Sequence, residues 1–380
     1  MVFQFYSNFR RISDNPFFCL NNPNMHVRKL LSLFAATLLL NSLAAQDIHF
    51  TQFYMSPMTM NPAMSGKFEG TIRIGGIYRG QWASVVGGSD SYKTPSLWAD
   101  APIIRGIRKQ DWIGVGLMFF ADKAGEVGLK HSAAKLSATY HLALGKKNTT
   151  VLSIGGQYGK GSRKLGDDFR FEDGFTGNPA PDDYSRALSQ DGNVADDASF
   201  TDIDAGVNLA SKLNKQMDFN IGFALFHLNE GKYSLVGRSD TSGPAPVNPT
   251  GGDAKIPRRM LLHGQFNAAL NDRWSLNPAF QYQTMGGADE IQLQGLLGYL
   301  FNPEKDITLN FGLGYRMRDA VQAILGAKIK DLRVGLAYDI NTSDLNAASN
   351  YRGGFELAAN YIIKIYKPAV VKPKVLCPRF

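Results

Sequence analysis

Polar and apolar residues alternate one by one along most of this chain, and this pattern limits its fold more than any other feature. In residues 130–144, one parity is apolar or aromatic and the other holds Lys135, Ser137, Thr139 and His141. Successive side chains of a β-strand point to opposite faces of a sheet, so this segment is predicted to be a strand with one apolar and one polar face. The alternation recurs in about 14 segments of about 9–13 residues, the number and length typical of a transmembrane β-barrel. These segments are 71–81, 92–101, 111–121, 130–144, 149–160, 201–211, 215–228, 258–270, 273–284, 290–301, 308–317, 321–330, 331–341 and 354–364.

Strand length and the polar face distinguish a membrane barrel from a soluble β-protein. Strands of soluble sandwiches are usually about 5–6 residues long, and they bury their apolar face against a second sheet. Here the strands are longer, and the second face repeatedly carries Asp, Asn, Gln, Lys and Glu. A polar lumen with lipid outside fits this pattern. We therefore predict an all-β fold, a transmembrane β-barrel of antiparallel strands over residues 71–366, with aromatic girdles near strand ends that include Trp82, Trp98, Trp112 and Trp274.

The predicted connections differ between the two ends of the barrel. One end has tight and often basic turns, at 145–148, 212–216, 271–272, 302–306 and 328–331. The other end has longer connections at 83–91, 122–129, 161–200, 229–257 and 342–350, and two short ones at 285–289 and 318–320. Bacterial barrels place short turns in the periplasm and longer loops outside the cell. Loops 161–200 and 229–257 are therefore expected on the cell surface.

Residues 1–45 have the layout of a leader and secretory signal peptide. A short basic stretch at 25–29 precedes an apolar run at 30–40 and small residues at 41–45, and the apolar run is too short to span a bilayer. We expect the true start at Met25, cleavage near Ala45, and an outer-membrane destination for the exported chain. The alternative is a buried N-terminal helix. Residues 367–380 are expected to form a short periplasmic tail.

Catalytic and metal-binding patterns are weak in this sequence. The segment 167–204 is rich in aspartate, which fits either a solvated acidic loop or a Ca²⁺ site, although EF-hand spacing is absent. The histidines have no metal-ligand spacing, and neither a phosphate-binding loop nor a G-x-S-x-G motif is present. The basic residues lack interleaved aromatics, so nucleic-acid binding has no support. We expect no enzyme activity, no cofactor and no metal; a surface hydrolase would need His131 or His227 near the acidic loops.

Two motifs at the start of the exported chain carry a family resemblance. Residues 46–54 read QDIHFTQFY and residues 61–66 read NPAMSG. Together they resemble the start of the PorP/SprF family, outer-membrane proteins of the type IX secretion system of Bacteroidetes, although Ile48 and Thr51 stand where Pro and Ser are common. Further matching stretches are 78–82, 200–204, 226–228, 256–258, 313–316, 335–341 and 377–380.

The resemblance implies a FadL-like barrel of 14 strands that is not a catalyst. It implies as partners a secreted cargo protein with a C-terminal type IX export domain of the type B kind, such as an adhesin of gliding bacteria, and other secretion components on the periplasmic side. Outer-membrane lipid would surround the barrel. The alternative is a FadL-type transporter of hydrophobic small molecules, which should have apolar lumen positions that converge on a pocket.

Two regions are candidates for function within this barrel. We expect residues 46–70 to lie in the lumen as a plug, because Pro57 and Pro62 prevent a long helix and Asn61 can turn the chain. The motif residues of this plug are Phe50, Gln52, Phe53, Tyr54, Asn61, Pro62, Ala63 and Gly66. We expect the outer loops to dock cargo through Asp167, Asp168, Phe171, Asp173, Asp182, Asp183, Tyr233 and Arg238.

Overall fold

A computed structural model describes most of the barrel and the segment that precedes it. It covers residues 47–83, 85, 91–107, 110–125, 128–145, 149–166, 175, 197–233, 254–344 and 346–365. The expected signal peptide, the C-terminal tail and nearly all of the acidic loop therefore lie outside the described residues. Among the residues covered, no α-helix combines the length and the apolar character needed to span a bilayer.

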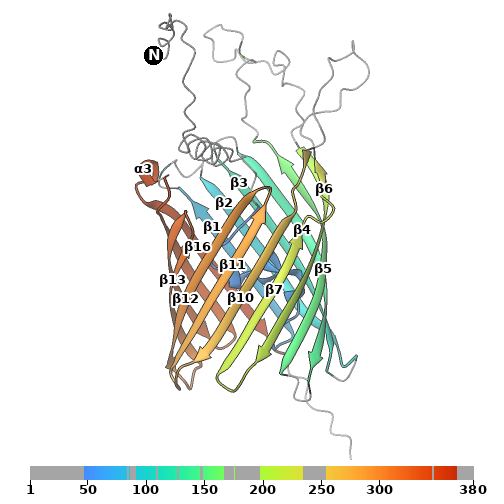
Figure 1. Cartoon of the computed structure of the whole chain (residues 1–380), viewed down its shortest axis with the longest axis vertical. Helices are drawn as coiled ribbons and strands as arrows, with labels where there is room; N and C mark the ends of the chain where they lie inside the picture. The colour runs from blue at the N-terminus through green and yellow to red at the C-terminus, as the bar shows by residue number, and fades with distance from the viewer. Residues whose placement is uncertain are drawn as a thin grey trace, which may run out of the picture. The chain divides into compact units, whose positions relative to one another are not determined.

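Fourteen antiparallel strands close into a barrel, each pairing with its neighbours in sequence and the first pairing with the last (Figure 1). They are β1 (Ile72–Gln81), β2 (Tyr92–Arg105), β3 (Trp112–Ala124), β4 (Leu129–Leu144), β5 (Thr150–Lys164), β6 (Asp197–Lys212), β7 (Met217–Phe226), β10 (Arg259–Ala269), β11 (Trp274–Met285), β12 (Ala288–Asn302), β13 (Ile307–Arg316), β14 (Ala320–Ile329), β15 (Leu332–Asn341) and β16 (Arg352–Ile363). The predicted fold and strand number are confirmed. Two short strands, β8 (Lys232–Tyr233) and β9 (Ala254–Lys255), pair separately.

Several strands are longer than predicted at the end that carries the long loops. Strands β5 and β6 pair as far as Lys164 and Asp197, so both ends of the predicted loop 161–200 belong to the barrel wall. Glycines and charged residues interrupt the apolar parity there, which hid these strand ends from sequence analysis.

The two faces of the strands have the predicted character. Leu97 and Leu136 are each 63% exposed on the outer face, whereas Lys135, Ser137 and Thr139 point inward and are buried. The prediction that Trp98 and Trp112 belong to an aromatic girdle is wrong. Trp98 is 3% exposed and packs in the interior. Trp112 stacks on the buried ring of His141.

Residues 47–66, here called the N-terminal segment (blue in Figure 1), supply buried side chains to two hydrophobic clusters. The segment contains three single-turn helices, η1 (Phe53–Met55), α2 (Pro57–Met60) and η2 (Pro62–Met64). Proline occupies the first position of α2 and of η2, where its missing N–H costs nothing and its ring fixes a helical φ. Because each proline also prevents a helix from extending through it, the segment folds as a chain of tight turns.

Apolar residues of the N-terminal segment pack against inward-facing residues on two sides of the barrel. Phe50, Met55 and Met58 belong to a buried cluster with Trp98 and Phe120. A second buried cluster joins Phe53 and Met60 to Phe226 and Leu261. The polar inner face predicted from the sequence therefore includes apolar positions where the segment packs.

Candidate functional site

The backbone of Thr51 is held by side chains from strands β12 and β16. Its N–H donates to Oε2 of Glu356 at 2.7 Å, and the N–H of Gln52 donates to Oε1 of the same carboxylate at 2.6 Å. The carbonyl oxygen of Thr51 accepts from Nε2 of Gln292 at 2.8 Å and of Gln294 at 2.6 Å. All of these side chains are buried, so the segment replaces the water that they would otherwise need.

The hydroxyl of Thr51 lies at the centre of a buried charge network. It donates to Oδ1 of Asp339 at 2.8 Å and accepts from Nη1 of Arg79 at 2.7 Å and Nη2 of Arg316 at 3.0 Å. The two guanidinium groups also pair directly with Asp339, at 2.8 and 3.2 Å, and Arg79 lies 3.5 Å from Glu356. Buried charges are tolerated only when they are paired and hydrogen-bonded, and Thr51 completes this arrangement.

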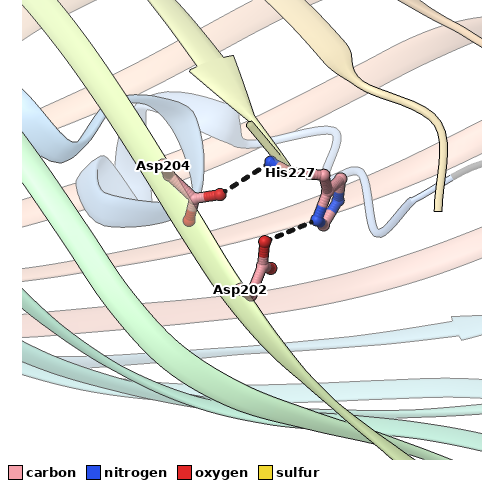
Figure 2. Close-up of side chains that lie close together, drawn as sticks. All are labelled: Asp202, Asp204 and His227. Atoms are coloured by element: carbon pink, nitrogen blue, oxygen red, sulfur yellow. Dashed lines mark hydrogen bonds and ion pairs between the residues drawn. The ribbon is translucent and has the colours of Figure 1, made fainter. Parts of the chain in front are cut away.

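A second buried network holds the start of the segment through His227, which directly follows β7. Figure 2 shows Nδ1 of His227 beside Oδ1 of Asp202, at 2.9 Å, and its backbone N–H donating to Oδ1 of Asp204, also at 2.9 Å. Nε2 of the same ring lies 3.2 Å from Oδ2 of Asp47, in the N-terminal segment. Burial alone would lower the pKa of His227, but the hydrogen bonds that its ring donates to the carboxylates of Asp202 and Asp47 raise it to about 9. The ring therefore carries a proton and bridges two carboxylates.

Lys135 and Arg259 supply the remaining positive charges of this network. Nζ of Lys135 lies 2.6 Å from Asp202 and 2.7 Å from Asp204, and Nη2 of Arg259 lies 3.3 Å from Asp47. Burial would raise the pKa of Asp47, but Arg259 holds it well below the usual value. Protonated His227, Lys135 and Arg259 thus balance three carboxylates.

The same group has the outline of a metal site. One ligand atom from each of Asp202, Asp204 and His227 lies within 4.8 Å of the others. The ammonium group of Lys135, however, occupies the position between the two carboxylates that a cation would take, and both ring nitrogens of His227 face carboxylates. The arrangement is complete as an ion-pair network.

The Asn61-Pro62-Ala63 motif is tied to the wall by its own polar atoms. Nδ2 of Asn61 donates to the carbonyl of Val207 at 2.9 Å and lies 3.1 Å from Nε2 of His263, while Oδ1 accepts from the N–H of Ala63 at 2.9 Å. The carbonyl of Pro62 accepts from the hydroxyl of Thr139 at 2.8 Å. Asn61 therefore caps η2 and anchors it at once.

The end of the segment is anchored through Gly66. Its N–H donates to Oδ2 of Asp100 at 2.7 Å, and its carbonyl accepts from Nε1 of Trp112 at 3.0 Å. Gly66 has a φ of +73°, which glycine adopts without strain. Asp100 is in turn paired with Arg73, so the turn into β1 is fixed by a partly buried ion pair.

Glycines in the wall lie where the backbone or polar atoms of the segment come closest. A Cβ on Gly335 would overlap Oε1 of Gln52, a Cβ on Gly206 would overlap Oδ1 of Asn61, and a Cβ on Gly114 would overlap the carbonyl of Ser65. A Cβ on Gly155 would lie 2.8 Å from Cα of Ala63. The wall and the segment are therefore matched in shape at several separate points.

The structure gives positions to all of the predicted motif residues of the segment. Phe50, Gln52, Phe53, Asn61, Pro62 and Ala63 are buried, Tyr54 is half-buried, and Gly66 makes the turn described above. Of the predicted cargo-docking residues, Tyr233 lies in β8 and pairs with Ala254. The others lie outside the described residues: Asp167, Asp168, Phe171, Asp173, Asp182, Asp183 and Arg238.

Sequence analysis missed the charged residues that hold the segment. Asp202 and Asp204 fall both in the acidic segment 167–204 and in the predicted strand 201–211; they lie in β6, point inward and are buried in ion pairs, which the sequence did not indicate. The other residues whose role in the two networks was not predicted are Asp47, Thr51, Arg79, Lys135, His227, Arg259, Arg316, Asp339 and Glu356. A usable signal existed, because several of them fall in the motifs that carry the family resemblance.

Comparisons with known proteins identify one family. The family described as "Type IX secretion system membrane protein PorP/SprF" matches residues 42–361. A search of curated proteins found no match. Among solved structures, the TodX deltaS2S3 mutant monoaromatic hydrocarbon channel is 10% identical, with a TM-score of 0.46 over 80% of this chain and 93% of that one. The toluene transporter TbuX of Ralstonia pickettii is 11% identical, with a TM-score of 0.42 over 84% of this chain and 93% of that one.

Proposed function

This chain belongs to the PorP/SprF family and is an outer-membrane component of the type IX secretion system, and from that premise we propose that it supports export and surface anchoring of particular cargo proteins. The cargo would carry a C-terminal type IX export signal of type B, as large surface adhesins do. The barrel acts in this proposal as a binding platform and catalyses no reaction.

The observation that carries this proposal is the set of buried contacts around the N-terminal segment. Thr51 and Asn61 each join strands that lie far apart in the sequence, and the wall glycines fit the segment closely. We infer that the segment, continued to residue 70, is a resident plug of the lumen. A plugged barrel has no open path through its centre, so its function is assigned to its two ends.

The cargo-docking surface is assigned to the end that carries the long loops. The strands that flank the predicted loops 161–200 and 229–257 end on this side, where β5 and β6 pair as far as Lys164 and Asp197. The acidic residues from Asp167 to Asp183, with Phe171, Tyr233 and Arg238, would contact cargo there. Residues 1–45 would be removed as the signal peptide, which N-terminal sequencing of the outer-membrane protein tests directly.

The two alternative functions have less support. A transporter of hydrophobic molecules needs an apolar path through the barrel, but the inward-facing residues beside the plug include Lys135, Gln292 and Glu356. A surface hydrolase needs a histidine that can serve a nucleophile. His227 does lie beside aspartates, but both of its ring nitrogens face carboxylates, and His131 packs against the rings of Phe120 and Phe200.

The decisive experiment is affinity purification of the tagged protein from outer membranes, followed by mass spectrometry. We expect a large secreted protein with a C-terminal type IX export domain to co-purify, and to be lost when residues 167–196 are replaced by a short glycine-serine loop. The matched control replaces residues 343–350, a loop at the same end. Cargo recovery that is insensitive to the first replacement would refute docking by the acidic loop, and recovery of a hydrophobic ligand without any protein would favour the transporter.

A further inference from the structure

A cavity of about 380 Å³ opens at the end of the barrel that carries the short turns, next to the N-terminal segment. It is lined by Tyr54 and Pro57 of the segment and by residues at the turn ends of β1, β14, β15 and β16. A second cavity of about 410 Å³ adjoins it and shares Tyr54, Lys328 and Arg333. Both volumes fall in the range of ordinary ligand pockets, roughly 300–1,000 Å³.

The first cavity has a clear excess of positive charge. Its lining includes six basic residues: Lys67, Arg73, Lys328, Lys330, Arg333 and Lys364. Its acidic residues are Glu69, Asp306 and Asp331.

Half of these basic groups are already paired. Arg73 pairs with Asp100, Lys328 with Asp306 at 2.9 Å, and Lys364 with Asp331 at 2.5 Å. Among the residues the structure describes, Lys67, Lys330 and Arg333 form no ion pair. Lys67 instead donates to the neutral amide oxygens of Asn208 and Asn220.

The state of Lys67 agrees with a shortage of negative charge at this end. Burial, and then the nearby guanidinium of Arg73, lower the pKa of Lys67 to about 7. An anion that entered the cavity would relieve this repulsion and stabilise the charged ammonium.

Beyond the shared Lys328 and Arg333, the polar lining of the adjoining cavity consists mainly of neutral amides. This cavity is lined by Gln265, Asn267, Asn277 and Asn310, together with Gln52 of the segment. The side chain of Gln52 is fully buried, and neither its amide nitrogen nor its oxygen has a hydrogen-bond partner among the described residues. Amides that offer both a donor and an acceptor suit the N–H and C=O groups of a peptide backbone.

Two nearby candidates for an occupant are unsuitable. The chain's own C-terminal residues 366–380 contain Lys367, Lys372, Lys374 and Arg379 and no acidic residue, so the cavity would repel them. Phospholipid head groups lie against the outer face of a barrel, whereas these cations surround a cavity that residues of the N-terminal segment help to line.

We propose that this turn-side cavity binds an acidic peptide segment of a periplasmic partner protein, with carboxylates on Lys67, Lys330 and Arg333 and backbone groups on the amides beside Gln52. The assignment of the short turns to the periplasmic side rests on the proposed function above. The charge and shape of the cavity do not depend on the cargo.

The test uses the full-length protein in detergent micelles and a fluorescein-labelled hexaglutamate peptide, with binding measured by fluorescence anisotropy at moderate salt. We expect the double variant K330E/R333E to bind at least about tenfold more weakly than the wild type, because charge complementarity is reversed. The control variant K255E reverses a charge on β9, at the other end of the barrel, and should change the affinity less than about twofold. Heat-modifiable gel mobility checks that each variant is folded, and R333Q provides a milder substitution if the double variant is not.

Each remaining outcome counts against the proposal. The proposal is wrong if the wild type does not bind the peptide, or if K255E weakens binding as much as K330E/R333E does. It is also wrong if inorganic phosphate, or phosphatidylglycerol vesicles, displace hexaglutamate at equal charge concentration, because the site would then be a simple anion or lipid site. Cargo export is measured separately in cells that lack the gene, so a failure of the proposed function leaves the peptide result interpretable.

Discussion

Substitution of Thr51 by valine removes one hydroxyl and keeps the branched shape of the side chain. That hydroxyl makes one hydrogen bond to Asp339 and accepts one each from Arg79 and Arg316, and all three partners are buried. A net value of about 1 kcal/mol for each bond gives a loss of about 3 kcal/mol. This loss is a lower limit, because hydrogen bonds to charged partners are stronger than bonds between neutral groups. At about 1.4 kcal/mol for each factor of ten, the segment should leave its position roughly 150 times more often.

The release of the segment can be followed through the reactivity of a buried cysteine. Met58 is fully buried, so a cysteine placed there reacts with a maleimide only when the segment opens. Cys19 and Cys377 are first replaced by serine, and labelling rates are compared for M58C, M58C/T51V and M58C/T51S. The serine variant keeps the hydroxyl and serves as the matched control.

We expect T51V to label about a hundred times faster than T51S, when opening and closing are faster than labelling. If the two variants label within about threefold of each other, the hydroxyl does not hold the segment and the argument from the Thr51 network fails.

Two further predictions test the fit and the charges of the same segment. G114A should lower the free energy of unfolding of the barrel by about 1–3 kcal/mol, because the new Cβ overlaps the carbonyl of Ser65. G156A should change this free energy little, because the atom nearest to its new Cβ is 3.6 Å away. Equal effects of the two would show that the segment does not press on the wall. For His227, the folded-state pKa of about 9 lies above the usual 6.5, so its contribution of about 3 kcal/mol is complete below pH 6.5 and is lost as the pH rises through 9. The difference in melting temperature between wild type and H227Q should therefore shrink between about pH 6 and pH 10, and a constant difference would contradict the bridging role.

The barrel was predictable because its signal is local. Alternation within each segment sets which residues face lipid, and the polar inward face of β4 follows directly from it. Trp98 was misassigned because an aromatic near a strand end resembles a girdle residue. Its true direction depends on the neighbouring strand, where Gly75 pairs with it and leaves room for the indole.

The buried networks were not predictable in the same way, because their partners are far apart in the sequence. Thr51 and Asp339 are 288 residues apart, and Asp47 and His227 are 180 apart. Single-sequence patterns describe neighbours along a strand and contain no record of pairs across a lumen. A charged residue on an inward face therefore reads as a residue of a wet lumen, even where it has a fixed partner.

The motifs that carry the family resemblance become one physical unit in the structure. Arg79, Asp202, His227, Arg316 and Asp339 come from five separate motif stretches. Three of them bond Thr51 and two belong to the network that holds Asp47, so all five hold the N-terminal segment. These five motif residues therefore secure the N-terminal segment inside the barrel, whereas none of the five comes from 167–196 or 234–253. If cargo docks as proposed above, exchanging residues 167–196 and 234–253 between family members should change the cargo without releasing the segment.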